Sequence, residues 1–214
     1  MAQPSSYSSP TIMSSSASSP PDVELSDADL VRQAQQGNAK AFDLLVTRYR
    51  GKVYGMCYHL VHNEQDAWDL AQNAFIKAWR ALGSFKGDSA FYTWIYRITH
   101  NVAYDWMRKR KIQGDGEFND EINAAIAVGA EAVPKSDPAP DEAMKNQEIG
   151  KRIHQAIAQL SPDHRTAILL REVEGNSYEE IAEIMQSTVG TVMSRLFYAR
   201  KKLQELLKDT YENA

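Results

Sequence analysis

The sequence has a single cysteine, Cys57, in 214 residues, and it has no apolar run that approaches the length of a membrane span. One thiol excludes an internal disulfide framework and a cysteine-rich zinc site, and it is compatible with a reducing compartment. A membrane-spanning helix needs about 18 or more apolar residues in succession. The first residues also lack the basic start and apolar core of a secretory signal. We therefore expect a soluble, cytoplasmic protein.

Short motifs of common catalytic sites are missing as well. Neither the phosphate-binding pattern G-x-x-x-x-G-K-[ST] nor the zinc pattern H-E-x-x-H occurs. Cys57, His59 and His62 are close in sequence, but residues 57 and 59 of a helix point to different faces, which disfavours a metal site. We predict that the protein is not an enzyme and uses no cofactor or metal.

Charge is distributed unevenly along the chain. The formal net charge of −4, from 24 basic and 28 acidic residues, argues by itself against nucleic-acid binding. Counting by segment reverses that inference. Residues 31–112 carry thirteen bases and six acids, residues 113–148 carry two and nine, and residues 149–214 carry nine of each. The pattern predicts a basic domain and a neutral domain separated by an acidic connector.

Composition places the boundaries of these parts. Nine of the first twenty residues are Ser, so residues 1–25 are predicted to be a disordered tail. Gly and Pro recur in the acidic linker predicted over residues 113–146, which is expected to be flexible and could be a passive tether. The folded domains are predicted over residues 26–112 and 147–210. Apolar residues recur at helical spacing in both, which predicts an all-α fold of two small helical domains.

The first domain ends in an aromatic and basic stretch. Residues 90–113 contain no Gly or Pro, which predicts a long helix after a loop over residues 84–89. Seven aromatic residues lie within residues 85–106, and a basic run follows at residues 108–111. Rings interleaved with cations suit a surface that stacks unpaired bases and neutralises phosphates.

The alternative is that these rings form the domain core, and we favour it for Phe91 and Trp106. At about 3.6 residues per turn, Tyr92, Tyr96 and His100 cannot share the face of Phe91. We therefore expect these three side chains to face outward. An earlier helix is expected to be capped by Asn63 or Asp66, with its inner face formed by Leu70, Ala74, Ala78 and Leu82.

The second domain contains a helix-turn-helix pattern. Ser177 and Glu180 form a capping-box sequence ahead of a short apolar helix, and a break at residues 186–187 precedes a longer amphipathic helix over residues 189–206. Residues 165–183 carry two bases and five acids, whereas residues 184–208 carry five bases and one acid. The longer helix is therefore expected to face DNA, with a helical hairpin that binds only protein as the alternative.

Three segments stand in register along the chain: DAWDLAQNAFIKAWR at residues 66–80, FKGDSAFYTWIYRI at residues 85–98, and SYEEIA with GTVMSRL at residues 177–182 and 190–196. Together they resemble the extracytoplasmic-function (ECF) sigma factors of bacterial RNA polymerase, and in particular the sigma-E-like group. The resemblance covers roughly residues 25–207. It implies that the first domain is sigma region 2 and that the second is sigma region 4.

The resemblance also implies sites and partners. Core polymerase would be bound through its clamp helices by Asp66, Asp69, Gln72, Phe75 and Trp79. The melted minus-10 element would be bound by Lys86, Gly87, Asp88, Ser89, Tyr92, Trp94, Arg97, Asn101 and Arg108. The minus-35 duplex would be read by Thr188, Gly190, Thr191, Met193, Ser194, Arg195, Tyr198 and Arg200.

Further partners implied by the resemblance are the flap of the second-largest polymerase subunit, promoter DNA and an anti-sigma factor, which is often membrane-bound. The expected function is promoter-specific transcription initiation in response to stress or an envelope signal. A stand-alone helix-turn-helix regulator is the alternative, and binding to core polymerase distinguishes the two.

Overall fold

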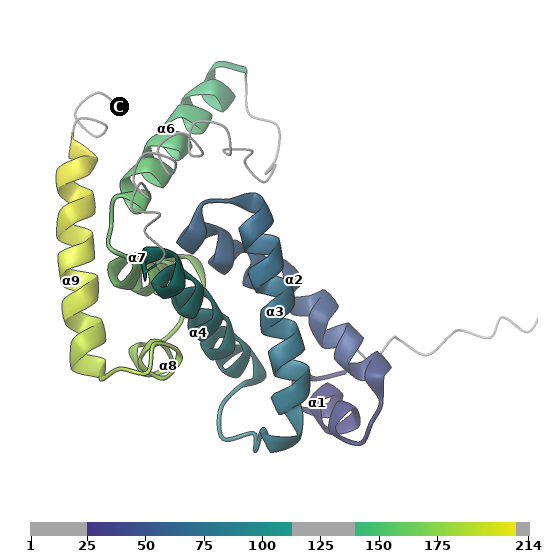
Figure 1. Ribbon diagram of the computed structural model, residues 1–214. Coiled ribbons are helices and arrows are strands. Elements are labelled where there is room, and N and C mark those ends of the chain that lie inside the picture. The colour runs from purple at the N-terminus through teal and green to yellow at the C-terminus, as the bar shows by residue number, and fades with distance from the viewer. Residues whose placement is uncertain (1–24, 113–139, 209–214) are drawn as a thin grey trace, which may run out of the picture.

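The computed structural model describes residues 25–112 and 140–208, with side chains for residues 25–110 and 148–208 (Figure 1). Every regular element in these ranges is a helix, which confirms the predicted all-α class. The predicted tail lies outside the described residues except for Leu25, and so does the predicted linker up to residue 139. None of the described helices is both long enough and apolar enough to cross a bilayer.

The first half of the described chain forms four α-helices and one short 3-10 turn. They are α1 (Asp27–Gln35), α2 (Ala39–Val61), α3 (Glu64–Ala81), η1 (Leu82–Ser84) and α4 (Phe91–Ile112). Helices α2, α3 and α4 pack on one another, and α1 lies against α2. The long helix predicted from residue 90 is therefore present as α4.

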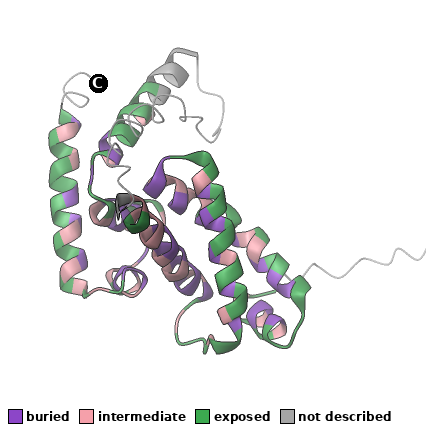
Figure 2. Ribbon diagram, viewed as in Figure 1, coloured by how far each residue is buried: buried purple, intermediate pink, exposed green. Residues whose placement is uncertain are grey.

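Helix α3 shows how sequence sets local structure here. The side chain of Asn63 accepts a hydrogen bond from the Asp66 amide at 2.9 Å, which confirms Asn63 as one of the two expected caps. The inner face of α3 consists mainly of alanine, so α3 can lie close to α2 and α4; its buried residues are Ala67, Leu70, Ala71, Ala74 and Ala78. The larger side chains of α3 are left on its outer face, most of which is exposed in Figure 2.

The second half of the described chain contains the helix-turn-helix. Its elements are α6 (Pro140–Ala158), α7 (Pro162–Ile168), the π-helical turn η2 (Leu169–Val173), α8 (Tyr178–Ile184) and α9 (Val189–Leu206). Helix α6 begins at Pro140, so the last residues of the predicted linker belong to a helix.

Both helices of the helix-turn-helix begin with a side-chain cap. Ser177 accepts from the Glu180 amide while Glu180 accepts from the Ser177 amide, which confirms the capping box at the start of α8. Thr188 accepts from the Thr191 amide at 3.1 Å and begins α9. Gln186 lies in the turn between them with a positive φ of 49°.

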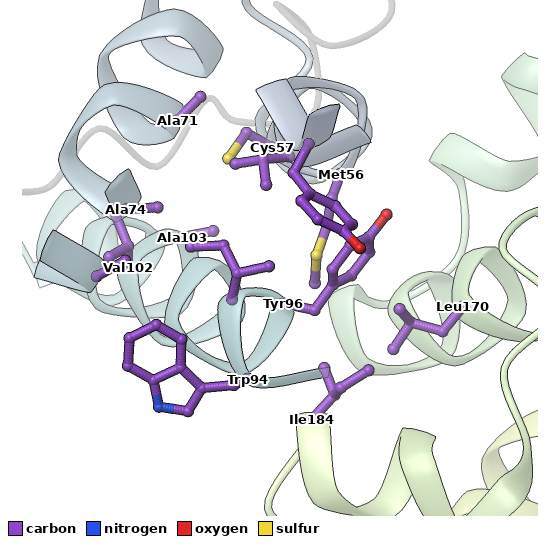
Figure 3. Packing of buried hydrophobic residues seen from close by; sticks show 14 of the residues in the cluster. Met56, Cys57, Ala71, Ala74, Trp94, Tyr96, Val102, Ala103, Leu170 and Ile184 are labelled. Atoms are coloured by element: carbon purple, nitrogen blue, oxygen red, sulfur yellow. The ribbon is translucent and has the colours of Figure 1, made fainter. Parts of the chain in front are cut away.

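The two halves pack against each other, with α4 on α8 and α2 on α7. One continuous apolar core joins them: Tyr96 of α4 and Met56 of α2 are buried together with Leu170 of η2 and Ile184 of α8 (Figure 3). The expectation that Tyr96 and His100 face outward is therefore wrong. They do leave the face of Phe91, but the second domain covers them, and they are 2% and 7% exposed.

Candidate functional site

An apolar groove lies on the outer faces of α2 and α3. It exists because the alanine face of α3 is buried and the large side chains opposite remain in solvent: Trp68, Ile76 and Trp79 are 50%, 40% and 43% exposed. The ring of Trp79 packs on Phe42 of α2, with centroids 4.9 Å apart. The groove encloses about 520 Å³ and is lined by Phe42, Val46, Arg50, Trp68, Asp69, Ala71, Gln72, Phe75, Ile76 and Trp79.

Four of the five residues expected to bind polymerase line this groove, and Asp66 does not. Asp66 lies at the N-terminus of α3, where Arg110 from the end of α4 donates to its carboxylate at 3.2 Å. Sequence reasoning missed Trp68 and Ile76. Their spacing of four residues from Gln72 on either side places them on the same helix face, which is the signal that could have identified them.

The loop before α4 borders a second concave surface. Lys86, Gly87 and Ser89 line a pocket of about 850 Å³ together with residues of α1 and α2. Gly87 has a φ of 78°, a conformation that glycine adopts without the steric cost of a Cβ. Lys86 and Asp88 are exposed. The loop thus presents backbone and a cation at the rim of a hollow.

Trp94 does not lie on this surface. Its side chain is 6% exposed and packs on Phe85 and Phe91, with ring centroids 4.9 and 5.7 Å away. The expectation that Trp94 lies beside a flipped base is therefore corrected: its ring is part of the core beneath the loop, where it supports Phe85.

The side of α4 away from its own domain core faces α8 and α7. The hydroxyl of Tyr92 donates to Glu180, and Arg97 donates to Glu183 at 3.4 Å. Burial, followed by the bond to Glu180, raises the pKa of Tyr92. The bond from Tyr92 is in turn the main cause of a lowered pKa for Glu180. Two side chains predicted to contact DNA are therefore held by carboxylates of the other domain.

The remaining predicted minus-10 residues are more accessible. Arg108 is exposed and pairs with Asp105 one turn earlier, at 2.9 Å. Asn101 is half-buried. Near the middle of the same helix, the hydroxyl of Tyr104 donates to Asp163 at 2.5 Å. Tyr104 was not among the predicted site residues, because its partner lies 59 positions away in sequence.

The exposed face of α9 carries large apolar side chains beside its cations. Met193 and Tyr198 are 54% and 57% exposed, and so is Phe197 at 62%, which sequence reasoning did not single out. Arg195 donates to Asp163 at 2.6 Å. Arg200 donates to Glu172 at 2.7 Å. Helix α9, which is predicted to read the minus-35 element, therefore has some side chains exposed and others already bonded to carboxylates.

The first turn of α9 belongs to the same predicted surface. Thr188 and Gly190 are exposed, Thr191 is half-buried, and Ser194 is exposed one turn further on. Amides in the first turn of a helix have no partner within the helix and can donate to an anion. Across the side chains that the structure describes, no cluster of three His, Cys, Asp or Glu has the geometry of a metal site.

Comparison with known proteins matches both halves of the chain. Residues 45–112 match the family model for sigma-70 region 2, and residues 150–203 match the model for sigma-70 region 4. The RNA polymerase sigma-H factor of Pseudomonas aeruginosa is 48% identical over 188 residues, which cover 86% of this chain and 96% of that protein. The ECF RNA polymerase sigma-E factor of Escherichia coli K12 is 43% identical over 191 residues, covering 86% and 98%.

Solved structures also match most of the chain. The sigma factor RpoE of Bartonella quintana, solved in complex with the anti-sigma factor NepR, is 32% identical with a TM-score of 0.58 and covers 79% of this chain and 98% of its own. CnrH, solved in complex with the cytosolic domain of CnrY, is 26% identical with a TM-score of 0.61 and covers 86% and 97%. With both family models in order and this identity over nearly the whole length of its relatives, the chain belongs to the sigma-70 family, as an ECF sigma factor of RNA polymerase.

Proposed function

We propose that residues 26–112 act as region 2, which binds core polymerase and opens the minus-10 element, and that residues 147–210 act as region 4, which reads the minus-35 element. The observation that carries the assignment is α4 with its preceding loop. One helix connects a pocket bordered by Lys86 and Gly87, a row of polar side chains on its outer face, and a basic C-terminal end. Unpaired DNA needs all three features.

Core polymerase is assigned to the groove between α2 and α3. A groove of this size with exposed Trp68 and Trp79 suits the apolar face of a helical partner, because buried aromatic side chains dominate the binding energy of such contacts. The clamp helices of the largest subunit are such a partner. Asp69 and Arg50 at the groove would set the register of the two proteins through charge.

Melted minus-10 DNA is assigned to the loop and to α4 as far as Arg108. Extracting a base from the duplex costs a few kcal/mol, so a receiving pocket and cations for the adjacent phosphates are needed. The pocket beside Gly87 supplies space, and Lys86, Arg97 and Arg108 supply charge. Tyr92, on the side of α4 that faces α8, supplies a ring for stacking.

Duplex minus-35 DNA is assigned to α9. Its N-terminal amides and the hydroxyls of Thr188 and Thr191 suit a phosphate, which would place the helix in the major groove. Exposed Met193 suits contact with the methyl group of thymine. Arg195 and Arg200 would contact DNA once released from Asp163 and Glu172. The flap of the second-largest subunit would bind region 4 elsewhere.

This arrangement implies an order for polymerase binding and DNA binding. Promoter DNA competes with Glu180 and Glu183 of the second domain for Tyr92 and Arg97 of the first, so DNA binding at α4 requires the domains to separate. None of the described residues that line the groove on α2 and α3 takes part in these bonds, so the groove stays accessible. Polymerase can therefore bind the closed protein, whereas DNA binds the open one.

Regulation by an anti-sigma factor is part of the proposal. Two related sigma factors have been solved with protein partners, one of them a NepR anti-sigma factor and the other the cytosolic domain of CnrY. An anti-sigma factor that binds this chain would act by covering the groove or by holding the domains together. We place the protein in the cytoplasm with core polymerase, in a stress or envelope response, and assign it no catalytic activity of its own.

Reconstituted transcription tests the proposal. The full chain is mixed with core polymerase and a library of genomic fragments, and promoters are selected by run-off transcripts. We expect initiation at sites that share two elements with fixed spacing, and no initiation by core enzyme alone. Specific footprints by the protein alone, without initiation at any fragment when polymerase is added, would instead identify a stand-alone regulator.

A further inference from the structure

A single arginine joins the two domains at the point where α2 ends. Arg165 of α7 is 3% exposed, and its guanidinium crosses from the second domain to the first. Within the second domain it donates to the carbonyls of Ile157, Ala158 and Leu160. Toward the first domain it donates to the carbonyls of His59 and Leu60, at 3.1 and 3.4 Å, and to Nε2 of the His62 ring at 2.6 Å.

These carbonyls belong to the C-terminal ends of two helices. The last carbonyls of a helix have no partner within it and carry the negative end of the helix dipole. One buried cation therefore satisfies the ends of α2 and α6 together and ties the helices to each other. Among the described residues no carboxylate pairs with Arg165, so its charge is compensated by dipoles alone.

That geometry sets the protonation state of His62. A neutral imidazole has one ring nitrogen that accepts, whereas both nitrogens of the protonated ring are donors. Because Nε2 lies 2.6 Å from a guanidinium nitrogen, His62 must be neutral for the contact to exist. Protonated His62 would place a second cation against Arg165 in a buried site. His62 is 7% exposed, so little water is available to screen the two charges.

His59 of α2 belongs to the same cluster and faces the second domain. Its ring stacks on His154 of α6, with centroids 5.7 Å apart and an interplanar angle of 19°. Burial lowers the pKa of His59 to about 4, helped by His154 and Arg165. Glu174, which follows η2 and pairs with Lys52 of α2 at 3.3 Å, acts in the opposite direction.

The groups around His62 all act in one direction. Burial, followed by Arg165, His59 and His154, lowers its pKa to about 3. The ring of Tyr58, one turn earlier in α2, packs edge-on against it. Burial lowers the pKa of the Arg165 guanidinium to about 10, and Tyr104 of α4 acts in the opposite direction.

We propose that Arg165, His59 and His62 form a pH-sensitive latch, which holds the two domains together while the histidines are neutral and releases them when the histidines are protonated. The latch concerns the position of the domains only, so it stands or falls independently of which surface binds promoter DNA.

The direction and size of the effect follow from proton binding. In the open protein the two histidines have ordinary pKa values of about 6.5, so the closed protein binds fewer protons and is favoured at high pH. The free-energy advantage of the closed form is lost as the pH falls through about 6.5 toward the lowered pKa values of the two histidines. Between pH 7.5 and 5.5 each histidine shifts the equilibrium toward the open form about tenfold, and the pair shifts it about 100-fold.

Thiol labelling of the full chain measures this equilibrium. Thr166 of α7 is 1% exposed at the cavity between the domains, so the thiol of a Thr166→Cys variant reacts only when the domains separate. An Asn73→Cys thiol on the exposed face of α3 corrects for the pH dependence of the reagent, a pyridyl disulfide. Native Cys57 is fully buried in the core of the first domain and reports unfolding instead.

We expect labelling at position 166, relative to position 73, to rise about 100-fold from pH 7.5 to 5.5 while Cys57 stays protected. The His59→Gln, His62→Gln double variant removes this pH dependence, and His62→Gln alone reduces it to about tenfold. Glutamine keeps an acceptor for Arg165, and Gln186 shows that it tolerates a positive φ such as that of His62.

The control variant is His164→Gln, which removes the histidine adjacent to Arg165 in α7 and should leave the 100-fold rise intact. A flat profile in the parent overturns the latch, and so does a full rise that persists in the double variant. Equal acceleration at Cys57 also overturns it, because acid would then unfold the first domain rather than release it.

Discussion

Removal of one hydroxyl should shift the balance between the closed and open protein. Tyr104 of α4 donates to the carboxylate of Asp163 on α7, and this carboxylate also accepts from Arg195 of α9. The bond joins the two domains directly. Tyr104→Phe deletes it while keeping the ring that stacks on His100, with centroids 4.1 Å apart. Burial and the bond to Asp163 both raise the pKa of Tyr104, so the hydroxyl is a donor at neutral pH.

The magnitude follows from the kind of bond and its exposure. A hydrogen bond to a charged group contributes about 1.5–3 kcal/mol. The Asp163 side chain is 42% exposed, so we take the lower limit, which corresponds to roughly a tenfold shift toward the open form. When the closed form predominates, the apparent dissociation constant for DNA is the intrinsic one divided by the open fraction. The variant should therefore bind promoter duplex about tenfold more tightly without polymerase.

Fluorescence anisotropy of a labelled promoter duplex measures this change. Tyr54→Phe is the matched control, since its ring packs on Trp68 and Tyr58 within the first domain. The control should bind like the parent. If Tyr104→Phe and the control have the same affinity within twofold, the interdomain bond does not limit DNA binding and the competition argument fails.

Three further predictions concern the separate surfaces. Trp79→Ala should weaken core polymerase binding roughly 30-fold, as for a buried aromatic anchor, whereas Lys77→Ala should not; equal affinities by surface plasmon resonance would exclude the groove. Tyr92→Ala should spare polymerase binding but reduce open-complex formation roughly tenfold, because stacking on a base is lost; unchanged permanganate reactivity of promoter thymines would remove Tyr92 from the site. Ser177→Ala should lower the unfolding free energy by about 1 kcal/mol through loss of the Glu180 cap, and an unaltered urea midpoint would contradict it.

The helices were predictable because their signals are local. Asn63, Ser177 and Glu180 cap helices in the structure as their positions in the sequence predicted. The alanine face of α3 and the uninterrupted length of α4 could be predicted from the sequence in the same way. Each depends on residues within a few positions of one another, and helical spacing converts such patterns into faces.

The wrong predictions concern side chains whose surroundings depend on a distant part of the chain. Tyr96 and His100 leave the core of their own domain, as expected, but a second domain buries them. Trp94 was expected beside DNA and is part of the core instead. Asp66 was expected to contact polymerase together with Asp69 and Gln72, but it lies outside the groove that they line and pairs with Arg110. Helical spacing identifies the residues that share a face, but it does not identify what covers that face.

By itself the sequence determined the helical fold, the helix-turn-helix and the family, because capping residues, helical periodicity and three segments in register are all encoded over short distances. Only the tertiary structure decided that Tyr92 and Arg97, both predicted to contact DNA, are bonded to carboxylates of the opposite domain and that Arg165 joins the ends of α2 and α6. Residues 59 and 165 are more than a hundred positions apart, and their contact exists only because two helix ends leave carbonyls that one buried cation can satisfy.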